Sequence, residues 1–123
     1  MSGTKVSQTR ASRVPAAASE SNVPDPTMPA TATLGPMAGL LNVTGGISWS
    51  FAATPPYGTK LTLRDNGIIK RTWFVSAGGP GQLRLEPPIC NADVNTSIVL
   101  TLDGLGSGIP STVNFDSAWT ETP

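Results

Sequence analysis

The stretch TKLTLRDNGIIKRTWFVS, residues 59–76, decides the fold class. Leucines alternate with polar residues across positions 60–64, and this period of two is typical of a half-buried β-strand. The pair Asn66-Gly67 follows, and it tolerates the positive φ angles of a tight hairpin turn. We therefore expect 68–76 to pair antiparallel with the first run. Its mixed phase requires either a bulge or a strand with both faces partly covered.

The same alternation recurs on both sides of this hairpin. An earlier run places Ile47, Trp49 and Phe51 on one face, opposite two serines. The run that holds Leu83 is expected to end at Pro87-Pro88, because proline cannot donate to a strand ladder. Six short runs separated by turn residues predict an all-β fold, a small antiparallel β-sandwich that is jelly-roll or Greek-key like. The inward rows after the hairpin are Leu83 and Leu85; Ile98, Leu100 and Leu102; and Val113 and Phe115, the last two opposite Asn114 and Asp116.

The glycine-rich stretch Gly78-Gly79-Pro80-Gly81 raises the question of a phosphate-binding loop. Such a loop needs a lysine and a serine or threonine directly after its glycines, at the start of a helix. Here 82–84 reads QLR and continues in strand alternation. The pattern therefore predicts a corner of the sheet rather than a phosphate site.

Residues 1–39 differ in composition from residues 40–123. The first part is rich in Pro, Ala, Ser and Thr, and every aromatic residue of the chain lies after Gly46. Prolines remove backbone donors and disfavour helix in the residue before each of them. We expect an extended N-terminal arm without packed elements, followed by one β-sandwich domain. Two readings of the arm stay open, a disordered tail and a segment that becomes ordered on a partner.

Charge and cysteine content exclude several classes of protein. The chain has 8 basic and 8 acidic residues, and no cluster of Lys and Arg indicates a nucleic-acid partner. Cys90 is the single cysteine and histidine is absent, so neither an internal disulfide nor the usual zinc site is expected. Cys90 is interpreted as a buried or semi-buried, inert thiol. No apolar run is long enough for a membrane span or a secretory signal, and no membrane partner is expected.

Catalytic chemistry finds no support in the residue pattern. No spacing singles out a pair of carboxylates for acid-base work, and no nucleophile has a base beside it. The chain is therefore predicted not to be an enzyme, and neither a metal nor a cofactor is expected. Asn42 and Asn95 begin glycosylation patterns, which are interpreted as coincidental. The carboxylates considered are Asp65, Glu86, Asp93, Asp103, Asp116 and Glu121.

The order of turns and strands in residues 47–116 resembles small β-sandwich proteins of tailed bacteriophages, a group that includes head decoration (cement) proteins. The resemblance rests on ISWSF (47–51), PYGTKLTL (56–63), AGGPG (77–81), EPP (86–88) and SIVLTL (97–102), together with the turn at 65–67. It departs from the group at DGLGSGIPS (103–111), which puts the geometry of the last hairpin in doubt.

The resemblance implies a virion structural protein that binds the outer capsid surface and strengthens the shell. Its implied partners are the major capsid protein and further copies of itself, as a homotrimer. It would be assembled in the host cytoplasm and located on the virion. In this interpretation the arm binds capsid through small apolar anchors, namely Val14, Met28, Leu34, Met37, Leu40 and Leu41.

The alternative is a carbohydrate- or host-binding module of a virion fibre or tail. Such a module would use an exposed aromatic residue such as Tyr57 or Trp119 as a platform on which a sugar ring stacks. The alternative interpretation of both residues is purely structural: they pack in the core or at its rim.

Overall fold

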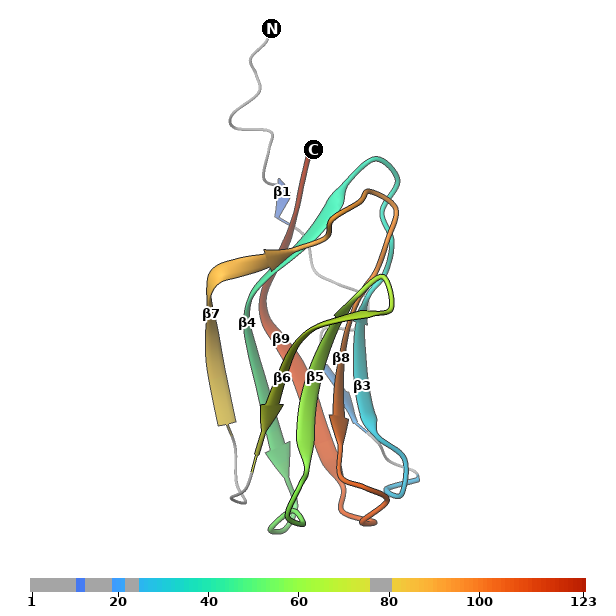
Figure 1. The fold of residues 1–123 in the computed structure, drawn as a ribbon, viewed down its shortest axis with the longest axis vertical. Coiled ribbons are helices and arrows are strands. Elements are labelled where there is room, and N and C mark those ends of the chain that lie inside the picture. Colours follow the sequence, from blue (N-terminus) through green and yellow to red (C-terminus); the bar gives the residue numbers. More distant parts are fainter. Residues whose placement is uncertain (1–10, 13–18, 22–24, 76–80) are drawn as a thin grey trace, which may run out of the picture.

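The computed structural model describes residues 11–12, 19–21, 25–75 and 81–123, and these form two facing antiparallel sheets (Figure 1). Sheet A has the order β1-β9-β4-β7, with β2 also paired to β9, and sheet B has the order β3-β8-β5-β6. Sheet A contains β1 (Ala11–Ser12), β2 (Ser19–Ser21), β4 (Leu41–Phe51), β7 (Gly81–Cys90) and β9 (Ser111–Glu121). Sheet B contains β3 (Ala30–Leu34), β5 (Lys60–Asp65), β6 (Ile68–Phe74) and β8 (Ile98–Asp103).

The connections between strands make the fold a jelly roll. From β2 to β9 the chain crosses from one sheet to the other at each step, except at the hairpin between β5 and β6. This winding brings β4 between β7 and β9, which are far apart in the sequence. The all-β sandwich expected from the sequence is confirmed, and its six strands after residue 40 are β4 to β9.

The hairpin at residues 60–74 has the expected turn. Asn66 and Gly67 both have positive φ, 51° and 83°, a conformation that asparagine tolerates and that glycine adopts freely because it lacks a Cβ. The register between β5 and β6 shifts between Leu63 and Arg64. This bulge explains the mixed phase of the β6 sequence.

The core lies between the sheets and is built from the inward rows that the alternation predicts. Ile47, Leu61, Leu100 and Val113 are fully buried, and Phe115 is nearly so. Trp49, Phe51 and Trp73 are partly buried and pack against this core. Burial of such side chains contributes about 1.5 to 3 kcal/mol each, so these rows supply much of the stability.

The expectation that residues 1–39 contain no packed element is wrong at β3. In ATATL, Ala30, Ala32 and Leu34 alternate with threonines and are fully buried against the opposite sheet. Every residue of β3 pairs with β8, from Ala30 opposite Leu102 to Leu34 opposite Ile98. The division of the chain at residue 39 stays a prediction, but the sandwich itself includes this earlier strand.

The expectation that Pro87-Pro88 ends its strand is also wrong, because β7 continues to Cys90. It is the outermost strand of sheet A on its side, and prolines are tolerated on such an edge. Its pairing with β4 shifts register between Thr44 and Gly46, and the prolines lie beside this irregularity. The corner expected at Gly78–Pro80 lies outside the described residues, and Gly81 is the first residue of β7.

A buried polar cluster joins one end of the two sheets. Asp65, only 3% exposed, accepts hydrogen bonds from Asn91 Nδ2 at 2.6 Å and from the Ala92 backbone nitrogen at 2.9 Å. Asn42 Nδ2 donates to the carbonyl oxygens of Gly35 and Thr96 at 2.9 and 3.0 Å. The Asn42 backbone nitrogen donates to Asn91 Oδ1 at 2.8 Å. These bonds satisfy polar groups that would be costly to bury without partners.

Candidate functional site

The outer face of sheet A carries a row of polar side chains across three strands. In the register of the sheet, Ser48 of β4 lies opposite Asn114 of β9 on one side and opposite Gln82 of β7 on the other. Alternation turns these side chains outward, while Ile47 and Val113 point into the core. The jelly-roll winding is therefore what brings three separate polar positions together.

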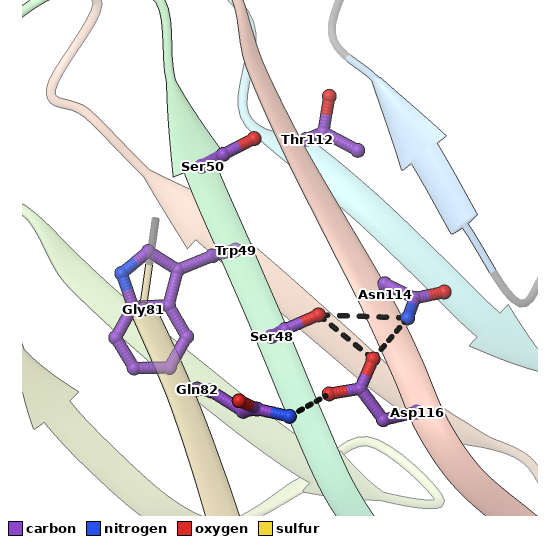
Figure 2. A pocket seen from close by; sticks show the side chains of 8 residues that line it. All are labelled: Ser48, Trp49, Ser50, Gly81, Gln82, Thr112, Asn114 and Asp116. Carbon is purple, nitrogen blue, oxygen red and sulfur yellow. Dashed lines mark hydrogen bonds between the residues drawn. The ribbon is translucent and has the colours of Figure 1, made fainter. Parts of the chain in front are cut away.

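Asp116 is the centre of this row. Its Oδ1 accepts hydrogen bonds from Ser48 Oγ, at 2.8 Å, and from Asn114 Nδ2. Its Oδ2 accepts from Gln82 Nε2 at 3.5 Å, and Asn114 Nδ2 also lies 3.5 Å from Ser48 Oγ. Figure 2 shows these side chains converging on Asp116 from β4, β7 and β9. We call Ser48, Gln82, Asn114 and Asp116 the polar platform.

The polar platform forms part of an open hollow of about 480 Å³. At one end of the hollow the indole ring of Trp49 lies against Gly81 (Figure 2), so closely that a Cβ at Gly81 would come within 2.2 Å of two ring atoms. Glycine at position 81 is therefore needed for this position of the ring. The residues that line the hollow are Ser48, Trp49, Ser50, Gly81, Gln82, Thr112, Asn114 and Asp116.

Hydrogen-bonding capacity remains on this surface. Ser50 and Thr112 lie opposite each other in the ladder between β4 and β9, and both line the hollow. A hydroxyl can donate one bond and accept two, and a carboxylate offers about four acceptor positions. The hollow therefore presents donors and acceptors side by side, on a scaffold whose own side-chain bonds already hold Asp116 in place. Such an arrangement suits a ligand with several neighbouring hydroxyl groups.

A second hollow of about 510 Å³ adjoins the first and shares Gln82 and Asp116 with it. Its floor includes Gly45 and Gly46, where the β4 ladders shift register. It is also lined by Trp119, Arg84 and Glu86, the last two forming an ion pair at 3.0 Å. We call it the Trp119 hollow; its remaining lining residues are Leu83, Leu85, Pro88 and Ser117.

The two candidate stacking residues of the sequence lie in different places. Trp119 lines the second hollow and is partly buried, whereas Tyr57 is 96% exposed and lines neither hollow. The structure therefore brings Trp119 together with Asp116 and leaves Tyr57 outside this site. The polar platform itself was not predicted as a site.

The six arm residues predicted to bind a partner are not part of either hollow. Val14 lies outside the described residues, Met28 is 57% exposed, and Leu34 is fully buried in the core. Leu34 faces the opposite sheet because of the alternation in β3, so it cannot contact a partner in this fold. Met37, Leu40 and Leu41 are half-buried. Capsid binding by the arm stays a prediction.

Cys90 is exposed at the end of the edge strand β7, which corrects the expectation of a buried or semi-buried thiol. Partial burial of the thiol, followed by the nearby carboxylates of Glu121 and Asp65, raises the pKa of Cys90 above its ordinary value. The described residues contain no group of three or more His, Cys, Asp or Glu side chains that could hold a metal ion. Within the described ranges no helix has the length and apolar character needed to cross a membrane.

Comparison with known proteins gives distant likenesses to solved structures. No protein-family model and no curated protein matches the chain. A solved arabinose-bound α-L-arabinofuranosidase is 17% identical, with a TM-score of 0.49 over 87% of this chain and 18% of that one. The CBM36-1 domain of a multidomain xylanase from the hindgut metagenome of Trinervitermes trinervoides is 11% identical, with a TM-score of 0.41 over 95% of this chain and 92% of that one.

A further solved structure is the carbohydrate-binding module TmCBM61 in complex with β-1,4-galactotriose. It is 16% identical, with a TM-score of 0.35 over 77% of this chain and 62% of that one. The chain spans only about a fifth of the arabinofuranosidase, the first of these structures. At these identities and TM-scores the likenesses do not say what this chain binds. The capsid partner, the homotrimer and the virion location stay predictions.

Proposed function

We propose that the protein is a carbohydrate-binding module whose site is the outer face of sheet A around the polar platform. The observation that carries the proposal is the position of Asp116, held by side chains from three strands on an exposed sheet face. Sugars present vicinal hydroxyl groups that both donate and accept hydrogen bonds, and binding sites use a few well-placed polar groups to orient their ligands.

The charge of the site supports a sugar rather than a phosphate or nucleotide. Among the described residues, Asp116 is the one ionisable side chain that lines the first hollow, so the field from these residues is negative and disfavours an anionic ligand. The bonds within the platform reduce the entropy that would be lost when a ligand is held, because the side chains are already oriented.

Affinity electrophoresis against polysaccharides tests this function. The neutral probes are xylan, β-1,4-galactan, arabinan and glucomannan, and polygalacturonate is the acidic probe. We expect retardation in at least one neutral polysaccharide, and loss of that retardation in Asp116→Ala. The matched control is Asp93→Ala, since Asp93 is also exposed and lines neither hollow.

Two outcomes would contradict the proposal. The first is the absence of retardation in every polysaccharide of the panel by protein whose melting curve is cooperative. The second is equal retardation of the wild type and Asp116→Ala, which would place binding elsewhere on the molecule.

A further inference from the structure

The two hollows form one path along sheet A. Both are lined by β4, β7 and β9, and they meet at Gln82 and Asp116. The length of the path can be measured along β4, which runs through its middle. Trp119 at one end pairs with Val43 of β4, and Thr112 at the other end pairs with Ser50. At a rise of about 3.3 Å per residue, these positions are separated by roughly 20 Å. A single sugar ring cannot span this distance.

Contacts with Glu121 and Gly45 help to hold the Trp119 ring in place. Its Nε1 donates a hydrogen bond to Glu121 Oε2 at 2.8 Å. Gly45 lies beneath the ring, and a Cβ at this position would come within 3.2 Å of two ring carbons. The glycine floor therefore allows the ring to lie close to the strand. An aromatic ring fixed in this way is a preorganised apolar surface at one end of a polar path.

The path also carries a net negative charge. Arg84 and Glu86 pair with each other in the Trp119 hollow, so their charges largely cancel. Among the described residues that line the two hollows, no cation remains to balance Asp116. A polysaccharide with carboxylate or sulfate groups would be repelled along this path.

We propose that the site binds a neutral, linear glycan lengthwise, with hydroxyl groups on the polar platform and a sugar ring stacked on Trp119. This inference rests on the proposed function and specifies its ligand as several consecutive uncharged sugar units. Trp119 acts as a specificity-determining residue that only a chain long enough to leave the first hollow can reach.

Isothermal titration calorimetry with oligosaccharides of one to six sugar units tests the inference. The oligosaccharides are fragments of the neutral polysaccharide that retards the protein most in affinity electrophoresis. We expect the affinity to rise about tenfold or more between the disaccharide and the hexasaccharide, because the longer chain gains the stacking contact. Trp119→Ala should lose that gain, while Trp119→Phe should keep part of it. Tyr57→Ala is the matched control, since its ring is exposed and lies outside both hollows.

The outcomes separate this inference from the proposed function. Equal affinity for disaccharide and hexasaccharide, or an unchanged hexasaccharide affinity in Trp119→Ala, would overturn lengthwise binding and leave carbohydrate binding intact. Polygalacturonate binding as tight as that of the neutral polymer would overturn the neutral ligand class. Failure of every polysaccharide in the panel to bind would overturn both the function and the inference.

Discussion

Two carboxylates in this molecule have similar partners and opposite surroundings. Asp65 and Asp116 each accept hydrogen bonds from asparagine side chains and from further donors. Asp65 is buried at the end of the sandwich, where its bonds join strands and loops, whereas Asp116 is exposed on a sheet face. Burial decides the role of the network. A buried hydrogen-bond network satisfies polar groups of the folded chain, whereas an exposed network can still form hydrogen bonds with a ligand.

The largest effect is expected from Asp65→Ala. The change leaves Asn91 Nδ2 and the Ala92 backbone nitrogen without their carboxylate acceptor in the interior. We expect the free energy of unfolding to fall by about 3 kcal/mol, measured by urea titration. Asp65→Asn keeps the size of the side chain and should lower the free energy of unfolding by less than Asp65→Ala does. A loss below about 0.5 kcal/mol in Asp65→Ala would show that the buried network does not hold the fold.

An intermediate loss of stability is expected from Gly81→Ala. This variant tests whether Trp49 packs closely against β7 beside the polar platform. The new Cβ would overlap the Trp49 ring, so the ring must move away from β7. We expect the free energy of unfolding to fall by about 1.5 kcal/mol, with a change in Trp fluorescence. Gly67→Ala is unsuitable as a control because of its positive φ, but Gly35→Ala meets no atom within 4 Å. An effect no larger than that of Gly35→Ala would contradict the close packing of Trp49.

A small effect on stability is expected from Asp116→Ala, although it should abolish glycan binding. Its partners Ser48, Asn114 and Gln82 are partly or fully exposed, so water can replace the carboxylate. We expect a change in the free energy of unfolding of at most about 0.5 kcal/mol. A loss comparable to that of Asp65→Ala would mean that the platform is structural, and the contrast between the two carboxylates would fail.

The smallest effect concerns the reactivity of Cys90. Its pKa is raised above the ordinary value by burial and by the carboxylates of Glu121 and Asp65, so little thiolate forms near neutral pH. Stability linked to this thiol is present below pH 9 and is lost as the pH rises through its folded-state pKa. Alkylation by iodoacetamide at pH 8 should be slower than that of a free cysteine. Asp65→Asn should accelerate it and Asp116→Asn should not; equal rates in both would contradict this link.

The strands could be predicted from the sequence because alternation is a local property. The hairpin at Asn66-Gly67 and the inward rows of β5, β8 and β9 all follow from residues adjacent in the chain. The strand β3 was missed because its small residues, Ala30 and Ala32, stand among prolines and no aromatic residue accompanies them. The continuation of β7 past Pro87 depends on its place at a sheet edge, which is a property of the whole topology.

The candidate site could not be predicted, because it exists only through pairings between distant segments. The sequence predicts Asn114 and Asp116 as outward polar residues of one strand and, separately, the two serines of 47–51 as the polar face of another. The ladder that places Ser48 beside Asn114, and Gln82 on its other side, is set by the jelly-roll winding. The sequence signal that could have indicated the site is the spacing of Asn114 and Asp116, which places an amide and a carboxylate two residues apart on the same face of β9.

The most direct test of the account is the mapping of a bound neutral hexasaccharide by amide chemical shifts in NMR spectra of the labelled protein. The account predicts that the shifted amides lie on β4, β7 and β9, at and beside Ser48, Gln82, Asn114 and Asp116 and extending to Trp119. Shifts confined to sheet B or to the loop that carries Tyr57 would contradict it.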